Sequence, residues 1–226
     1  MVYIILYLIA GATTIYAENE EYSMLMYISK VLLMPLLALY FHYHSKRTKP
    51  YIFIYLALFF SWLGDIFLMF PRNENSPDSK LLFTAGLVAF LIGHLNYIAH
   101  FTNEIKTKYR SSVFFKSPYF VLPFVLYIVV LLRLLFPTLG EMKIPVTIYG
   151  IVIGTMLLSA VNRKNIVNET SYYFVLIGAL LFVFSDSCIA LNLFYEKFEL
   201  ARMVIMLTYV LAQIIIIKGV LEAKPR

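Results

Sequence analysis

The chain has 226 residues, of which 61% are hydrophobic and 14% charged, and its formal net charge is +6. A soluble domain averages about 45–50% apolar and about 25% charged residues, so this composition excludes an ordinary soluble domain. The mean hydropathy of +0.79 and apolar blocks of roughly 16–23 residues predict several membrane-spanning helices. We expect a single all-α membrane domain over residues 1–226, surrounded by membrane lipids and binding no nucleic acid.

Polar or proline-containing breaks separate the apolar segments and define eight predicted spans. In chain order these are Val2–Ala17, Met24–His42, Tyr51–Phe70, Leu81–Phe101, Pro118–Phe136, Ile144–Val161, Tyr172–Phe194 and Leu200–Val220. The first span has neither a basic leader nor a clear cleavage site before Glu18, which favours a retained helix over a signal peptide. The sequence therefore predicts a bundle of eight transmembrane helices.

The basic residues are distributed unevenly between the two sides of this bundle. One side, which includes both termini, carries Lys46, Arg47, Lys49, Lys106, Lys108, Arg110, Lys116, Arg163, Lys164, Lys218, Lys224 and Arg226. The other side carries Arg72, Lys80, Lys143 and Lys197. Because cytoplasmic loops are enriched in Lys and Arg, both termini are predicted to be cytoplasmic. In a bacterium this would be an integral protein of the inner membrane.

Four ionisable side chains interrupt the apolar segments. Asp65 and Asp186 each lie inside a predicted span, where a charged residue costs about 2.5–3.5 kcal/mol on insertion scales. Lys30 and His94 lie inside two other spans. Such residues face a protein interior or a water-filled cavity rather than lipid. The sequence therefore predicts a polar site enclosed by the bundle.

The depth of these groups follows from the helical rise. Asp65, Lys30 and Asp186 lie about 8, 9 and 12 Å from the outer ends of their spans. His94 lies about 20 Å from the outer end if its helix starts at Leu81. Either that helix starts later or the polar site extends inward. Further polar residues that we expect to line the site and contact substrate are Tyr97, Tyr149, Asn192 and Gln213.

Each candidate also has a structural interpretation. His94 would then be a histidine hydrogen-bonded between helices, and Lys30 would extend to the outer interface or form an ion pair with an Asp. Gly64 and Gly93, each directly before an ionisable residue, would permit close helix packing.

Metal-binding and nucleophile motifs are absent from the sequence. There is no HxxxH, HExxH or paired-cysteine spacing, no Gly-x-Ser-x-Gly elbow and no phosphate-binding glycine loop. His94 with Asp65 and Asp186 would give three ligands on separate helices, so a metal-dependent lipid hydrolase is one possible function. We predict no cofactor. Two carboxylates with nearby cations fit acid–base chemistry on a molecule with an anionic headgroup.

A weak internal similarity relates the third and seventh spans. Ala57-Leu-Phe-Phe precedes Asp65 and Ala179-Leu-Leu-Phe precedes Asp186. A parallel 4 + 4 duplication would explain this, although the spacing to the Asp differs by one residue.

Several segments match the motifs of a known family in their order along the chain. They are SKVLLMPLLALY at 29–40, SWLGDIFLMF at 61–70, GLVAFLIGHLNYIAHF at 86–101, YGIVIGTMLLSA at 149–160, GALLFVFSDSCIALNLF at 178–194 and TYVLAQIIIIKG at 208–219. Over nearly its whole length the chain resembles the YhhN-like lysoplasmalogenase family. The family typically has Lys-Pro where this chain has Lys30-Val31, so the cation is retained. The resemblance implies an eight-span hydrolase that cleaves the vinyl-ether bond of lysoplasmalogens. Its products would be a fatty aldehyde and glycerophosphoethanolamine or glycerophosphocholine.

The candidate residues suit this reaction independently. A vinyl ether is cleaved by protonation at its β-carbon and capture of the oxocarbenium ion by water, which resembles glycoside hydrolysis by two carboxyl groups. We expect Asp65 and Asp186 to act as this pair, with His94 orienting water or an Asp and Lys30 binding the lysophospholipid phosphate. The alternative is a proton-coupled transporter or a lipid-binding membrane protein, because such carriers also use intramembrane Asp, His and Lys. The oligomeric state is left open.

Overall fold

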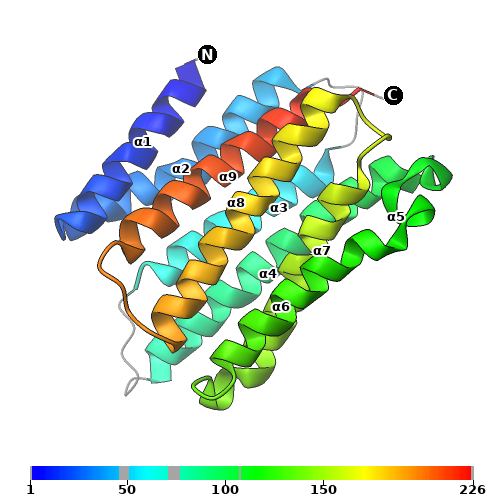
Figure 1. The fold of residues 1–226 in the computed structure, drawn as a ribbon. Coiled ribbons are helices and arrows are strands. Elements are labelled where there is room, and N and C mark those ends of the chain that lie inside the picture. The colour runs from blue at the N-terminus through cyan, green and yellow to red at the C-terminus, as the bar shows by residue number, and fades with distance from the viewer. Residues whose placement is uncertain (1, 46–50, 71–76, 107, 225–226) are drawn as a thin grey trace. The chain divides into compact units, whose positions relative to one another are not determined.

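The computed structural model describes residues 2–45, 51–70, 77–106 and 108–224, and the regular structure within these ranges is helical (Figure 1). The long helices are α1 (Val2–Asn19), α2 (Ser23–His44), α3 (Ile52–Leu68), α4 (Pro77–Lys106), α6 (Leu122–Leu135), α7 (Lys143–Asn162), α8 (Glu169–Phe194) and α9 (Ala201–Leu221). The short ones are η1 (Tyr109–Ser111), α5 (Val113–Lys116), η2 (Pro118–Val121) and η3 (Gly140–Met142). The predicted all-α fold is thus confirmed for the described residues.

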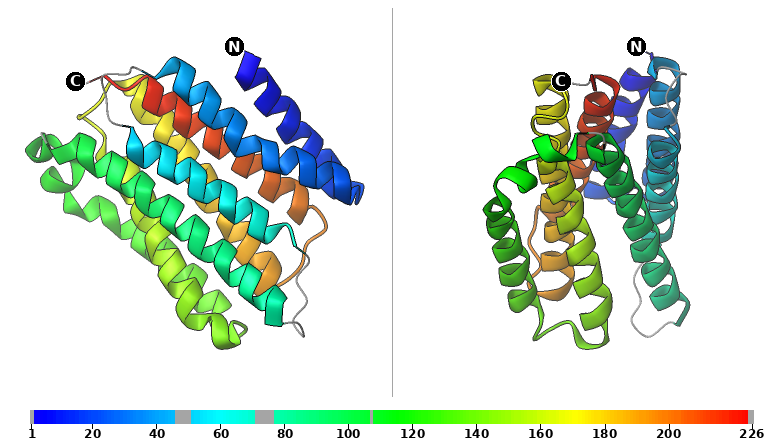
Figure 2. Two further views of the ribbon diagram at one scale, coloured as in Figure 1. Left: turned by 180° about the vertical axis from the view of Figure 1, so that it is seen from behind. Right: turned by 90° about the vertical axis from the view of Figure 1, so that its right-hand side faces the viewer.

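The chain divides into two compact units, Met1–Tyr97 and Ile98–Arg226, and the division falls inside α4. In the first unit, α1 packs along α2, and α2 packs against α3 (Figure 2). Leu33 and Leu37 of α2 and Ile54 of α3 are fully buried in this unit. A single domain over the whole chain stays a prediction.

In the second unit, α8 and α9 lie side by side along most of their length (Figure 1). Glycine allows this close approach. A Cβ atom at Gly178 of α8 would lie 2.9 Å from the Ala212 carbonyl oxygen, and one at Gly219 of α9 would lie 2.9 Å from the Val175 nitrogen. Small residues permit such contacts between membrane helices. Helix α7 packs against α8, and α6 packs against both α7 and α8.

Seven helical segments of the described chain are long and apolar enough to cross a membrane. The remaining apolar helix is α3, which has 17 residues and is shorter than the other candidates. The expected count of eight spans and the 4 + 4 repeat are therefore not confirmed. The apolar helices themselves agree with the prediction of a multi-pass membrane protein.

Helix ends differ from the predicted boundaries where polar residues continue a helix or proline interrupts one. Helix α4 begins at Pro77 rather than at Leu81, because Pro suits the first helical turn and Asp78 interacts favourably with the helix dipole there. His94 thus lies about 25 Å along its helix, and the idea that this helix starts later is wrong. The predicted segment Pro118–Phe136 consists of η2 followed by α6, with Pro123 in the first turn of α6.

Of the basic residues used to predict orientation, Lys46, Arg47, Lys49, Arg72 and Arg226 lie outside the described residues.

Candidate functional site

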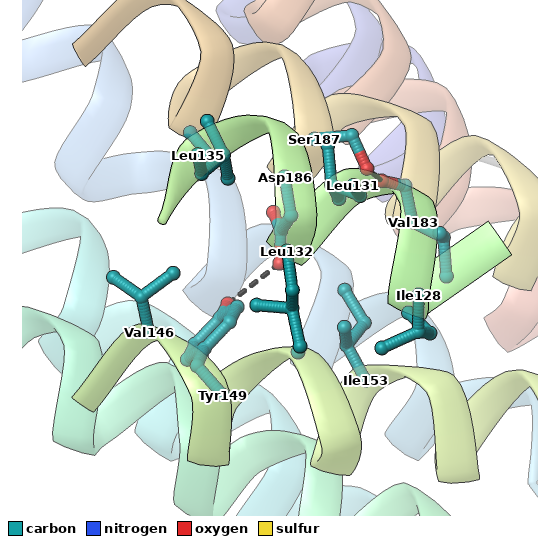
Figure 3. A pocket seen from close by; sticks show the side chains of 12 residues that line it. Ile128, Leu131, Leu132, Leu135, Val146, Tyr149, Ile153, Val183, Asp186 and Ser187 are labelled. Atoms are coloured by element: carbon teal, nitrogen blue, oxygen red, sulfur yellow. Dashed lines mark hydrogen bonds between the residues drawn. The ribbon is translucent and has the colours of Figure 1, made fainter. Parts of the chain in front are cut away.

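Helix α8 places Asp186 beside a tyrosine of α7. The Tyr149 hydroxyl donates a hydrogen bond to Asp186 Oδ2 at 2.6 Å, as Figure 3 shows. Both side chains are half-buried. Both residues were predicted from the sequence to belong to the site, and the structure brings them into direct contact although they are 37 positions apart. A carboxylate in such a contact has further lone pairs with which to accept a hydrogen bond from another donor.

The neighbouring Ser187 joins α8 to α6. Its Oγ donates to the Val183 carbonyl oxygen at 2.6 Å and lies 2.7 Å from the hydroxyl of Tyr127 in α6. Because the serine proton is engaged by Val183, Tyr127 acts as the donor in the second bond. Tyr127 was not predicted from the sequence, because a single hydroxyl on an exposed part of α6 carries no local signal of its role.

A cavity of about 40 Å³ lies between α6, α7 and α8 next to the Asp186–Tyr149 pair (Figure 3). Leu132 and Leu135 of α6, Gly150 and Ile153 of α7, and Ala190 of α8 are among its lining residues. Ser187 also belongs to the lining. The cavity is therefore mostly apolar, and its polar residues Tyr149, Asp186 and Ser187 belong to α7 and α8.

Asp65 belongs to the first unit, in the last turns of α3, and its residue is only 3% exposed. The side chains of Tyr7 in α1 and Tyr97 in α4, which belong to the same unit, are completely buried. His94, one turn before Tyr97, is 1% exposed. Asp65, His94 and Tyr97 are therefore shielded from water within one unit, as expected for an enclosed polar site.

Glycines bring α3 and α4 together around these residues. A Cβ atom at Gly64 would meet the Phe90 ring at 2.5 Å, and one at Gly93 would meet Ser61 Oγ at 3.3 Å. The interpretation of Gly64 and Gly93 as helix-packing residues is thus confirmed. Asp65 and Asp186 lie in different units, and their action as a catalytic pair stays a prediction.

Lys30 has a partner that the sequence analysis did not consider. Its Nζ lies 2.8 Å from Glu18 Oε1, and the two side chains are 14% and 15% exposed. One turn away, Thr14 Oγ1 is 2.9 Å from Ser29 Oγ, so two polar contacts join α1 to α2. Glu18 was treated as the start of the first loop, but α1 continues through Asn19. Lys30 therefore takes part in an ion pair, with Glu18 rather than with an Asp.

A proline explains a further polar contact within the first unit. Pro35 lies inside α2 and has no N–H, so it cannot bond the carbonyl oxygen of Val31 four residues earlier. The indole Nε1 of Trp62 in α3 donates to this oxygen at 2.9 Å. A side chain from a neighbouring helix thus satisfies the carbonyl that the proline leaves open, as membrane helices require.

A polar network in the second unit surrounds Arg163, which is 0% exposed. Arg163 Nε donates to Glu104 Oε2 at 2.7 Å, and its Nη2 donates to Ser171 Oγ at 2.9 Å. Ser171 Oγ in turn donates to the Gly219 carbonyl oxygen at 2.6 Å. The guanidinium also lies over the Phe101 ring. Arg163 was counted as a loop residue, but it joins the ends of α4, α7, α8 and α9.

The remaining predicted substrate contacts occupy different environments. Gln213 is completely buried in α9. Asn192 accepts a 3.4 Å hydrogen bond from the Phe198 N–H and thereby supports the turn between α8 and α9. Neither residue lines the cavity beside Asp186. Among the described residues, no group of three or more His, Cys, Asp or Glu is arranged to hold a metal ion.

Comparison with known proteins gives one match. The model of the YhhN family matches residues 25–220, which is most of the chain. Neither the search of curated proteins nor the search of solved structures gave a match. The resemblance drawn from the motifs is confirmed by this family match.

Proposed function

Because the chain belongs to the YhhN family, we propose that it is a membrane hydrolase that cleaves the vinyl-ether bond of lysoplasmalogens. The products would be a fatty aldehyde and a glycerophospho-alcohol. The observation that carries this proposal is the Asp186–Tyr149 hydrogen bond beside a small cavity within apolar helices. Carboxyl groups shielded from bulk water are suited to acid–base chemistry on a lipid.

In this proposal the protein crosses the membrane eight times, because α3 adds a span to the seven longer helices, and both termini lie in the cytoplasm. A 17-residue helix is about 26 Å long, at the lower limit for crossing a hydrocarbon core of about 30 Å. Local thinning of the bilayer accommodates a mismatch of this size at modest cost. The positive-inside distribution of Lys and Arg supports the orientation. In a bacterium the protein would be located in the inner membrane.

The proposed reaction begins with transfer of a proton to the β-carbon of the vinyl ether. This gives an oxocarbenium ion, which water attacks to form a hemiacetal. Collapse of the hemiacetal breaks the bond to the glycerol oxygen and releases aldehyde and alcohol. The enzyme must therefore supply one proton donor and one group that accepts a proton from water, as glycosidases do.

Asp186 suits the second task. Tyr149 fixes the direction of its carboxylate through Oδ2, and the cavity gives a small molecule access to the same side chain. We assign the proton donor to Asp65, the other carboxyl group within an apolar helix, since a donor carboxylic acid works best when it is shielded from water.

The remaining residues predicted from the sequence have orienting and substrate-binding roles. In this proposal His94 orients an Asp or water, and Lys30 binds the substrate phosphate at the outer end of α2 while remaining close to Glu18. Tyr97, Tyr149, Asn192 and Gln213 line or support the substrate site.

The decisive test uses the purified full chain in lipid nanodiscs. A lysoplasmalogen and its saturated ether analogue are supplied separately, and released aldehyde is detected as a hydrazone. The expected result is aldehyde from the vinyl ether and none from the saturated ether, which cannot form the oxocarbenium ion by protonation. Absence of aldehyde from both would contradict the proposal, and a transporter would give that result.

A further inference from the structure

The cavity beside Asp186 matches water in size and not a fatty chain. A water molecule needs about 10–15 Å³ of such space, so 40 Å³ holds about three. A buried water also needs two to four polar partners. Tyr149 of α7 and Asp186 and Ser187 of α8 are the polar residues of the lining, while the lining residues of α6 are Ile and Leu. Water in this cavity would therefore find its polar partners on the side of α7 and α8.

The space depends on a residue that has no side chain. A Cβ atom at Gly150 would lie 3.7 Å from Leu132 Cδ2 and 4.0 Å from Ile128 Cγ2, which are ordinary contact distances. Alanine would therefore fit there without displacing either residue, whereas a larger side chain would occupy the space itself. Gly150 directly follows Tyr149, so this opening lies next to the hydrogen-bonded pair.

We propose that this cavity binds the water that attacks the oxocarbenium ion, with Gly150 keeping it open and Leu132 limiting its size. This inference rests on the proposed function. The water oxygen forms a bond to the oxocarbenium carbon and its proton passes to the Asp186 carboxylate. In the collapse, Asp186 returns that proton to the glycerol oxygen as the carbon–oxygen bond breaks. The hemiacetal hydroxyl proton restores the acid that protonated the β-carbon, so one water is consumed.

A nucleophile larger than water distinguishes a confined site from an open one. In a mixture of water and 2-propanol, capture of the oxocarbenium ion by 2-propanol gives a mixed isopropyl acetal instead of aldehyde. The measurement is the ratio of acetal to aldehyde, compared with acid-catalysed cleavage of the same lysoplasmalogen in the same mixture without protein. For the wild-type protein we expect this ratio to be at least about tenfold lower than in free solution, because space for about three waters does not admit 2-propanol beside Asp186.

Two variants change the cavity in opposite directions. Leu132→Ala enlarges it and should raise the acetal fraction toward the free-solution value. Gly150→Val fills it and should lower kcat about tenfold or more with little change in KM, whereas Gly150→Ala should lower kcat less. The control is Ile151→Phe, which adds comparable bulk to an exposed position of the same helix and should leave both quantities unchanged.

The outcomes separate this inference from the function on which it rests. Aldehyde release with a wild-type acetal ratio equal to that of free solution would overturn the water site and leave the hydrolase intact. Full kcat in folded Gly150→Val would do the same. If Gly150→Val does not fold, Leu132→Ala still decides, since an unchanged ratio in that variant contradicts a size-limited cavity. No aldehyde from the wild type would end both proposals.

Discussion

Each compact unit carries one carboxylic acid inside an apolar helix and one cation paired with a glutamate, but the two units bury them in opposite ways. In the first unit Asp65 is 3% exposed, whereas the Lys30 and Glu18 side chains retain 14% and 15% of their exposure. In the second unit Asp186 is half-buried beside a cavity, and Arg163 is completely enclosed. In the proposed mechanism the accessible Asp186 accepts a proton from water and the shielded Asp65 donates one, whereas the enclosed Arg163 is expected to stabilise the fold.

The largest expected effect is on catalysis. Asp186→Asn and Asp65→Asn should each lower kcat for aldehyde release by about 10²–10⁴-fold, because the amide neither donates an acidic proton nor accepts one. The free energy of unfolding should hold, since Asn keeps the shape of Asp. The matched control is Asp78→Asn, an exposed position at the start of α4.

Groups that act as a unit are not additive, so the double mutant should be little slower than either single one. Substantial activity in both Asn variants would remove the carboxylate mechanism and assign the two Asp to structure.

The next effect is on stability and concerns the enclosed cation. Arg163→Met should lower the free energy of unfolding by about 3–5 kcal/mol, because it leaves Glu104 without its buried partner. Adding Glu104→Gln should restore part of this loss. Lys164→Met, at the exposed neighbouring position, is the control. Unfolding in mixed micelles measures all three, and a loss no larger than that of Lys164→Met would show that the network contributes little.

A smaller effect is expected at the proline of α2. Trp62→Phe removes the donor to the Val31 carbonyl oxygen and should cost about 1–3 kcal/mol, the cost of a buried acceptor left unsatisfied. In a Pro35→Ala background the backbone N–H can bond Val31 instead, so Trp62→Phe should cost less there. A double-mutant cycle of unfolding free energies measures the difference. Equal costs in both backgrounds would mean that the proline and the indole are not coupled.

The smallest effect is expected at the partly exposed ion pair. If Lys30 binds the substrate phosphate, Lys30→Met should raise KM about fivefold and leave kcat nearly unchanged, since the contact exists in the ground and transition states alike. Glu18→Gln keeps the cation and should not raise KM. Equal increases in KM from both variants would instead assign Lys30 to the α1–α2 contact alone.

The apolar helices were predictable because their cause is local. In lipid, each backbone polar group must be satisfied within its own helix, so a run such as Tyr172–Phe194 specifies a helix without reference to the rest of the chain. Helix ends that lie outside the apolar run were not predictable. Hydropathy does not register Pro77 and Asp78 as favourable first-turn residues. Hydropathy also could not decide whether α3 crosses the membrane, because its 17 residues are at the lower limit of the required length.

The site residues show the same limit. Asp186 and Tyr149 attract notice because polar groups are costly in apolar helices, yet their mutual hydrogen bond depends on the packing of α7 on α8. Arg163 was misjudged because its partner Glu104 is 59 residues away, and a basic residue at a helix end is ordinarily a solvated one. Long-range pairing was the information that the sequence lacked.

The two glycine contacts between α8 and α9 have a consequence for movement. Gly178 faces Ala212 and Ile216, and Gly219 faces Phe174 and Val175, so sliding either helix by one turn would press a side chain into backbone. The register of α8 relative to α9 is thereby fixed. Asp186, two turns beyond Gly178, therefore keeps its position along the helix axis relative to α9. Helix α6 meets the glycines of α7 through side chains only, with Ile128 near Gly154, and Leu135 is its one buried residue. Changes in the size of the cavity are therefore expected to come from movement of α6, while the Asp186 carboxylate keeps its position.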